Sequence, residues 1–233
     1  MTDTERSSED IYGALSREYD LQTVFYLIAS QSFSFVSVSD SYALLDRISP
    51  EEFVRDEQMP YWAEIWPAAL TLSEFVAEKI DIEGKRLIEI GAGVGMVSVT
   101  AARAGGNVLS TDYSDEALRF IRLNALHNGV ALETGRLDWR CIQLEERFDV
   151  LLAADVLYER VNLLPIVNAL DKLLKPEGCA YIADPRRRLA EQFLGLAFEN
   201  GFSVQTFAKS NVRDGQTTAV NIYRLSKQPA ADE

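Results

Sequence analysis

Residues 86–112 read RLIEIGAGVGMVSVTAARAGGNVLSTD, and the rest of the predicted fold is built around them. A short apolar run ends in a glycine turn, a helical segment follows over 94–104, and a second apolar run ends at Asp112. The glycines of the turn are Gly91, Gly93 and Gly95. Strand, glycine turn, helix, strand and acid, in that order, form the first unit of a nucleoside- or dinucleotide-binding α/β domain. Glycine lets a ligand approach the backbone without a Cβ in the way. Asp112, at the tip of the second strand, is placed to accept hydrogen bonds from a ribose diol.

The spacing of the glycines distinguishes two kinds of nucleotide ligand. A dinucleotide fingerprint has its third glycine at position 96, where this chain has Met96. The third glycine lies one residue earlier, at Gly95, and Glu89 precedes the turn. Glycine turns also join strands to helices for structural reasons alone. The two flanking acids, Glu89 and Asp112, favour cofactor binding over that alternative.

An aromatic turn precedes the first strand of this unit. Pro60 and Pro67 bracket three large rings, Tyr61, Trp62 and Trp66. Pro67 suits the first turn of the helix that we expect next. Two interpretations stay open: a hydrophobic plug against the sheet, or at least one tryptophan lining a cofactor pocket.

A third strand is expected at 132–137, and it ends in Asp138 and Trp139. Ligands of open α/β sheets bind in the crevice outside the carboxyl ends of the strands. The carboxylate is therefore placed to accept from an exocyclic amine, and the indole to pack on a purine face. The alternative is a capped turn with a partly exposed tryptophan.

A continuous apolar run at 148–154 has the pattern of a central strand that is buried on both faces. It ends at Asp155, with Tyr158 three residues later. This carboxylate is expected to point into the crevice beside the glycine turn, although helix-capping acids also occur at such positions.

Hydrophobic periodicity, together with the residues that start and end helices, predicts the remaining elements. His127 is expected at a surface helix end, which argues against histidine-dependent chemistry. The arginine run 186–188 is either a solvent-exposed helix start or a contact to an acidic substrate or cofactor carboxylate. Residues 1–10 are expected to fray and 11–29 to form a helix followed by an irregular apolar segment. Further helices are expected at 67–80, 114–127, 162–174 and 189–199, and further strands at 33–38, 179–183, 202–208 and 218–225, with a polar, disordered tail at 227–233.

Composition limits the function classes. The 233 residues carry a net charge of −13, which disfavours nonspecific binding of nucleic acid. The polar N-terminus argues against a signal peptide, and no apolar run approaches the roughly 18 residues of a membrane span. Cys141 and Cys179 lack ligand spacing, so we expect buried thiols in a cytoplasmic protein with neither disulfide nor metal. One domain is the simplest organisation, and a monomer or weak dimer is expected.

Several separated motifs together resemble a known family. EIGAGVG with Asp112 is similar to motif I of class I S-adenosylmethionine-dependent methyltransferases. PYWAEIWPAA, LDW and AADVLY extend the resemblance over about residues 58–225 to the seven-β-strand protein-lysine methyltransferases, methyltransferase family 16. The D-x-x-Y signature, here Asp155 and Tyr158, is the most specific element. One branch, which modifies the electron-transfer flavoprotein β subunit, shows ADPGR where this chain has ADPRRR.

The resemblance implies a fold and a site. The fold is α/β: a Rossmann-like, doubly wound sheet of seven strands, mostly parallel with a reversed last strand. An N-terminal extension, 1–57, would pack on a methyltransferase domain, 58–233. Contacts to S-adenosylmethionine are expected from Trp66, Gly91, Ala92, Gly93, Asp112, Trp139 and Ala154, and the same motifs add Trp62, Glu89, Gly95, Tyr113 and Asp138.

The expected reaction is methyl transfer to the amine of a protein lysine. Asp155 would hold and orient the amine, and Tyr158 would shape its channel. A small amine acceptor, such as nicotinamide, is the alternative within this chemistry. Two rivals from other classes are an NAD-dependent reductase, disfavoured by Met96 and the absence of a Tyr-x-x-x-Lys pair, and a non-catalytic methyltransferase-like binding module.

Overall fold

The computed structural model describes residues 3–47, 60–213 and 215–228. Within these residues a seven-stranded sheet has the order β5-β4-β3-β6-β7-β9-β8. β9 pairs antiparallel with both β7 and β8, and the other neighbouring strands are parallel. The predicted mostly parallel sheet with a reversed last strand is therefore confirmed. Its strands are β3 (Arg86–Ile90), β4 (Asn107–Asp112), β5 (Glu133–Arg136), β6 (Phe148–Ala154), β7 (Leu174–Asp184), β8 (Phe202–Arg213) and β9 (Gln216–Lys227).

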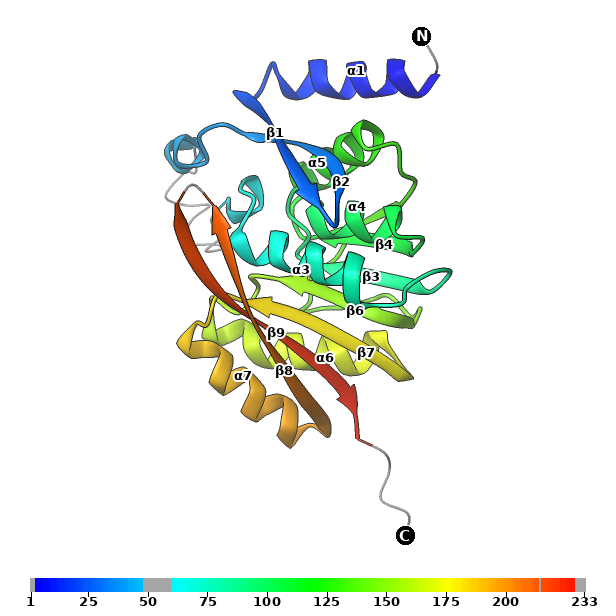
Figure 1. Ribbon diagram of the computed structural model, residues 1–233, viewed down its shortest axis with the longest axis vertical. Helices are drawn as coiled ribbons and strands as arrows, with labels where there is room; N and C mark the ends of the chain where they lie inside the picture. Colours follow the sequence, from blue (N-terminus) through cyan, green and yellow to red (C-terminus); the bar gives the residue numbers. More distant parts are fainter. Residues whose placement is uncertain (1–2, 48–59, 214, 229–233) are drawn as a thin grey trace.

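Helices cover both faces of the sheet because the central strands are apolar on both sides. Leu87 and Ile88 are adjacent in β3 and point to opposite faces, each into its own core cluster. α3 (Pro67–Lys79), α4 (Met96–Arg103) and α5 (Asp115–His127) lie on one side of the sheet. α6 (Leu163–Leu173) and α7 (Arg188–Glu199) lie on the other (Figure 1). None of the helices in this described part of the chain has the length and apolar character to cross a membrane.

The N-terminal elements pack on the side of the sheet that carries α3, α4 and α5. α1 (Asp3–Leu15) is followed by the antiparallel pair β1 (Leu21–Ile28) and β2 (Gln31–Val38). The strand at 33–38 is confirmed. Two expectations were wrong: the chain is helical from Asp3, so residues 3–10 do not fray, and the apolar segment after α1 is a regular strand. Antiparallel hydrogen bonding to β2 makes this segment a strand, although its own sequence did not indicate one.

Two asparagines attach β2 to α5. The Asn124 amide accepts from the backbone N–H of Val36 (2.7 Å) and donates to its carbonyl (3.0 Å), as a neighbouring strand would. Asn128, one helical turn later, repeats the pattern with the N–H (3.1 Å) and carbonyl (2.7 Å) of Ser34. The side chains of a helix thus complete the hydrogen bonds of a strand edge.

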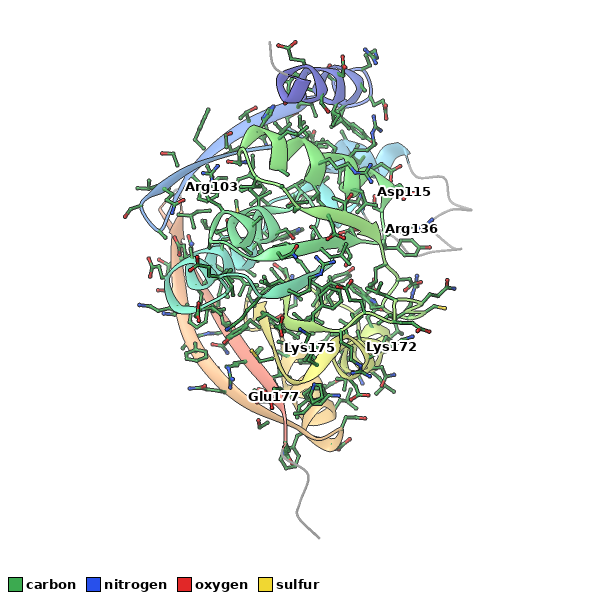
Figure 2. All side chains as sticks on the ribbon, turned by 90° about the vertical axis from the view of Figure 1, so that its right-hand side faces the viewer. Arg103, Asp115, Arg136, Lys172, Lys175 and Glu177 are labelled. Atoms are coloured by element: carbon green, nitrogen blue, oxygen red, sulfur yellow. The ribbon has the colours of Figure 1, made fainter. Side chains whose placement is uncertain are left out.

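Three elements differ from expectation in length or exposure. β7 begins at Leu174 and therefore includes the Lys175–Gly178 segment expected to end the preceding helix; a register shift opposite Phe148/Val150 accommodates it. Figure 2 labels Lys175 and Glu177, which lie at the start of β7. The β8–β9 hairpin extends further toward its turn than predicted. Cys141 is exposed and Cys179 only partly buried, so the expected burial of both thiols was wrong.

Some expectations fall outside the described residues. The boundary between an N-terminal extension and a methyltransferase domain, placed at 57/58, lies within 48–59. Most of the polar tail, 229–233, also lies outside them. The single histidine, His127, is exposed at the last turn of α5 and stacks on Tyr12, with ring centroids 6.4 Å apart. The expectation of a surface helix-end histidine is confirmed.

Candidate functional site

A cleft lies at the carboxyl ends of the central strands, where the strand order reverses beside β3. The space within it, open solvent included, is about 1120 Å³. Of the fourteen residues that the sequence predicts for the site, all but Gly95 line it. The lining residues from that set are Trp62, Trp66, Glu89, Gly91, Ala92, Gly93, Asp112, Tyr113, Asp138, Trp139, Ala154, Asp155 and Tyr158.

The glycine turn forms the floor of the cleft. Gly91 and Gly93 have positive φ angles of 64° and 56°, a region in which residues with a side chain are strained. A Cβ at Gly91 would lie 3.1 Å from the Trp139 ring, and one at Gly93 would lie 3.1 Å from the Trp62 carbonyl. Glycine at both positions therefore lets Trp139 and the backbone of Trp62 pack directly against the turn. Gly95 is different: its φ is 85° at the N-cap of α4, and it packs against Ile121 outside the cleft lining. It serves helix packing.

Asp112 lies beside the turn at the tip of β4. Its Oδ2 accepts from the backbone N–H of Gly93 (2.8 Å), and its Oδ1 accepts from that of Ser114 (2.9 Å). These bonds fix the carboxylate, and each oxygen keeps a further lone pair for a ligand hydroxyl. Burial raises the pKa of Asp112 to about 6, against the lowering effect of its backbone donors.

Glu89 has a structural environment although it borders the cleft. It is 2 % exposed, and its Oε2 accepts from the backbone N–H of Ser98 (2.8 Å) and from the Ser98 hydroxyl, which also lies 2.7 Å from Ser110 Oγ. Burial raises the pKa of Glu89 to about 8, so the side chain is mainly protonated at neutral pH. It joins β3 to the start of α4 and thereby holds the glycine turn.

One wall combines an indole and charged groups. Trp139 packs against the Gly91 backbone, and Tyr113 lies under the guanidinium groups of Arg136 and Arg140, 4.7 and 5.3 Å from its ring centroid. The Asp138 carboxylate accepts from Arg140 through both oxygens, at 2.9 to 3.2 Å. Arg136, the last residue of β5, lies beside Asp115 (Figure 2). Asp138 therefore lines the cleft as one partner of an ion pair.

The aromatic turn forms the opposite wall, on the 3₁₀ turn η2 (Tyr61–Ala63). Trp62 packs on Phe120, with ring centroids 5.4 Å apart, and also lines the cleft. The aromatic turn therefore both packs against the protein interior and supplies a tryptophan to the cleft. The Trp66 indole donates to the Tyr61 carbonyl (2.9 Å). The Tyr61 ring meets Tyr158 edge-on at 5.0 Å. Burial raises the pKa of Tyr158 well above its usual value, so the hydroxyl stays neutral.

Asp155 projects into the cleft from an unusual backbone. Its φ is 62°, a left-handed conformation that aspartate tolerates better than most residues with a side chain, and its N–H donates to the Ala183 carbonyl of β7 (2.8 Å). The residue is 8 % exposed. Its Oδ1 forms an ion pair with Nη1 of Arg187, which also lies 3.6 Å from Oδ2 of the buried Asp184. The arginine run thus contacts two acids of the protein itself.

Sequence reasoning missed several residues of the site. Arg187 was not singled out from its two neighbours, because its contact to Asp155 joins positions 32 apart in the chain. Tyr61 was noted among the aromatic residues and not selected; its place in an aromatic turn was the available signal. The other unselected polar residues that line the cleft are Glu64, Ser114, Arg140, Glu159 and Asn162.

Comparison with known proteins identifies the family. The sequence profile described as lysine methyltransferase matches residues 54–199, more than half of the chain. The chain belongs to the lysine methyltransferase family. It is accordingly a methyltransferase, and an NAD-dependent reductase is excluded.

Curated relatives within this family have similar lengths. The chain is 31 % identical to the EEF1A lysine methyltransferase 3 of Mus musculus, over 72 % of this chain and 74 % of that protein. It is 28 % identical to the protein N-lysine methyltransferase METTL21A of Danio rerio, over 73 % and 80 %. The fold is shared with a Thermus thermophilus 16S rRNA N2 G1207 methyltransferase solved with AdoMet and guanosine. That match has a TM-score of 0.62 and 15 % identity, and it covers 90 % of this chain and 51 % of that one.

Proposed function

We propose that the cleft binds S-adenosylmethionine and that Asp155 orients the amine of a protein lysine for methylation. S-adenosylmethionine is the methyl donor of the lysine methyltransferase family, and relatives of similar length are named for protein-lysine methylation. One observation carries the residue assignment: a tight glycine turn, a buried acid at the tip of β4 and a second buried acid after β6 share one cavity.

The residues present fit the donor. Asp112, held by two backbone donors, is positioned for the ribose diol beside the glycine turn, whose Gly91 and Gly93 line the same cleft. Trp139, which packs on Gly91, provides a flat face for the purine. Trp66 and Ala154 line the remaining cofactor side in this proposal.

The reaction requires placement more than acid–base power. S-adenosylmethionine supplies a methyl group already activated on a sulfonium. Holding a nucleophile in line can supply on the order of 7–11 kcal/mol of the barrier. A lysine has a solution pKa of about 10.4, so its amine must lose a proton before it can react. We assign to Asp155 the acceptance of an amine N–H, and to the Tyr61–Tyr158 pair the apolar wall along the lysine methylenes.

The Asp155→Ala variant tests this assignment. Turnover should be abolished while calorimetric binding of S-adenosylmethionine stays nearly unchanged, because Asp155 lies on the acceptor side. Asp171→Ala, an exposed acid outside the cleft lining, is the matched control and should keep wild-type turnover. Retained turnover in Asp155→Ala, or loss of cofactor binding, would contradict the role.

The acceptor class is decided by isotope transfer. Protein incubated with labelled S-adenosylmethionine and a cell lysate should place the label in acid-precipitable protein, on lysine. Label found only in the small-molecule fraction would indicate the alternative amine acceptor. Cofactor binding without any transfer would indicate a non-catalytic binding module.

Three further assignments accompany this function. We propose that residues 1–57 form an extension that packs on the catalytic domain 58–233, supported by the contacts of α5 to β2. We propose a cytoplasmic protein that is a monomer or weak dimer. We also propose that nucleic acid is not its acceptor, because the net charge is −13.

A further inference from the structure

The end of β7 places one guanidinium between two buried carboxylates. The Asp155 side chain is 5 % exposed and the Asp184 side chain fully buried, and Nη1 of Arg187 forms ion pairs with both. Arg187 does not line the cleft, whereas Asp155 does. Any effect of Arg187 on an acceptor therefore passes through Asp155 or through its charge.

The backbone fixes this arrangement. Arg186 is left-handed, with φ 61°, at the position where the ADPGR branch has glycine. Arg187 follows as the N-cap of α7, and its N–H donates to Oδ1 of Asp184 (2.7 Å). Asp155 is bonded to the same strand through the Ala183 carbonyl. The guanidinium and the carboxylate are thus held by neighbouring strand ends.

Other ionisable groups surround the pair. Tyr61 interacts electrostatically with Arg187, and Glu64, Tyr158 and Glu159 line the same cleft as Asp155. Asp184 contacts Arg187 directly, and Tyr223 interacts electrostatically with Asp184, Arg186 and Glu191. Burial raises the pKa of Asp184 to about 6 and lowers that of Arg187 below its usual range. Each of these groups is common to the variants compared below, apart from the one replaced.

An uncompensated buried carboxylate would work against methyl transfer. An opposite charge nearby stabilises the protonated form of an amine, and a neighbouring like charge disfavours it. A bare Asp155 would therefore bind a lysine as its ammonium ion, which has no lone pair to donate. Arg187 makes the closer of its two ion pairs with Asp155, and Asp184, the other partner, does not line the cleft. With Oδ1 so paired, the Asp155 carboxylate presents less negative charge to the acceptor and can accept an N–H without retaining the extra proton, which leaves to bulk water.

We propose that Arg187 is a positioning residue that neutralises Asp155, so that the acceptor site selects the free amine over the ammonium ion. The inference rests on the proposed amine-orienting role of Asp155 and deepens it. Arg187 accordingly sets the protonation state in which the acceptor binds, without touching it.

Binding of n-butylamine, the lysine side chain without its backbone, tests this directly. The full chain is saturated with S-adenosylhomocysteine, whose neutral thioether removes the sulfonium charge from the comparison. Dissociation constants for n-butylamine are measured by NMR titration from about pH 6 to about pH 10. If only the free amine binds, the apparent dissociation constant of the wild type falls about tenfold per pH unit, since affinity scales with the competent fraction.

The variants separate charge from structure. Arg187→Gln should bind the ammonium ion, so its dissociation constant should change less than about threefold over the range. Arg187→Lys, which retains a cation, and Arg188→Gln, an exposed neighbour, should keep the wild-type slope. An unchanged slope in Arg187→Gln, or a flat profile in the wild type, would overturn the proposal.

Folding and function failures are distinguishable. If Arg187→Gln fails to bind S-adenosylhomocysteine, the Asp155→Asn variant is tested in its place. This variant keeps the Arg187 cation and removes the Asp155 anion, so the dissociation constant for n-butylamine should still fall about tenfold per pH unit, with weaker binding. A dissociation constant that does not change with pH would again overturn the proposal. If the wild type itself fails to bind S-adenosylhomocysteine, the proposed function fails. If it binds and the amine profile is flat, this inference alone fails.

Discussion

The Asp112 carboxylate is buried and yet must be ionised to serve a ribose diol fully. Its pKa of about 6 means that the acid becomes protonated within an experimentally accessible range. We therefore expect affinity for S-adenosylmethionine to fall about tenfold from pH 7 to pH 5, in proportion to the ionised fraction. Calorimetry at a series of pH values measures this change.

Two variants control that experiment. Asp112→Asn keeps the shape and loses the titration, so its weaker affinity should not change with pH over the same range. Asp112→Ala should bind at least tenfold more weakly than wild type at neutral pH. A dissociation constant unaffected by Asp112→Ala would remove Asp112 from the cofactor site.

Glu89 affects stability in the opposite pH direction from an ordinary salt-bridged acid. Its pKa is raised from 4.5 to about 8 in the folded protein. The folded state therefore binds the proton more tightly, and the stabilisation is fully present below about pH 4.5 and is lost as the pH rises through about 8. The Tm of wild type should fall relative to that of Glu89→Gln between about pH 5 and about pH 8. Glu145→Gln, at an exposed position, should show no such relative change; a parallel pH dependence of wild type and Glu89→Gln would contradict the prediction.

At the scale of elements, α5 and β2 depend on side-chain amides for their contact. Asn124→Ala would leave the N–H and carbonyl of Val36, and the carbonyl of Val94, without their partner. Unsatisfied buried polar groups cost about 1–3 kcal/mol each. We expect the free energy of unfolding in urea to fall by about 2 kcal/mol or more. Arg122→Ala, on the exposed side of the same helix, should cost less than about 1 kcal/mol, and an equal cost in both variants would argue against the role of Asn124.

The elements also show what the sequence could predict. Strands β3 and β6 and the N-cap at Ser114 carry their signals locally, as apolar runs and a capping residue. β1 does not: its pattern becomes a strand only through pairing with β2, and β2 is positioned by asparagines about 90 residues away. In the site, the glycine turn and strand-end acids followed from local pattern. The Arg187–Asp155 ion pair did not, because it depends on how the ends of β6 and β7 meet.

The whole molecule carries a charge that should govern its partners. A net charge of −13 disfavours nonspecific attraction to phosphates, since that attraction comes from neutralising cations. In a filter-retention assay with labelled single-stranded RNA, we expect no binding tighter than the roughly 10⁻⁴–10⁻⁶ M typical of nonspecific complexes, even at low salt. Tight, salt-sensitive retention would contradict the proposed protein acceptor and favour RNA.

The tryptophans that line the cleft provide an intrinsic fluorescence probe. The chain has three tryptophans, and all of them, Trp62, Trp66 and Trp139, line the same cavity. Its tryptophan emission therefore originates entirely from the walls of this cleft. Ligand titrations can be followed by quenching in the unlabelled protein, and a single Trp139→Phe replacement would separate the signal of the purine wall from that of the aromatic turn.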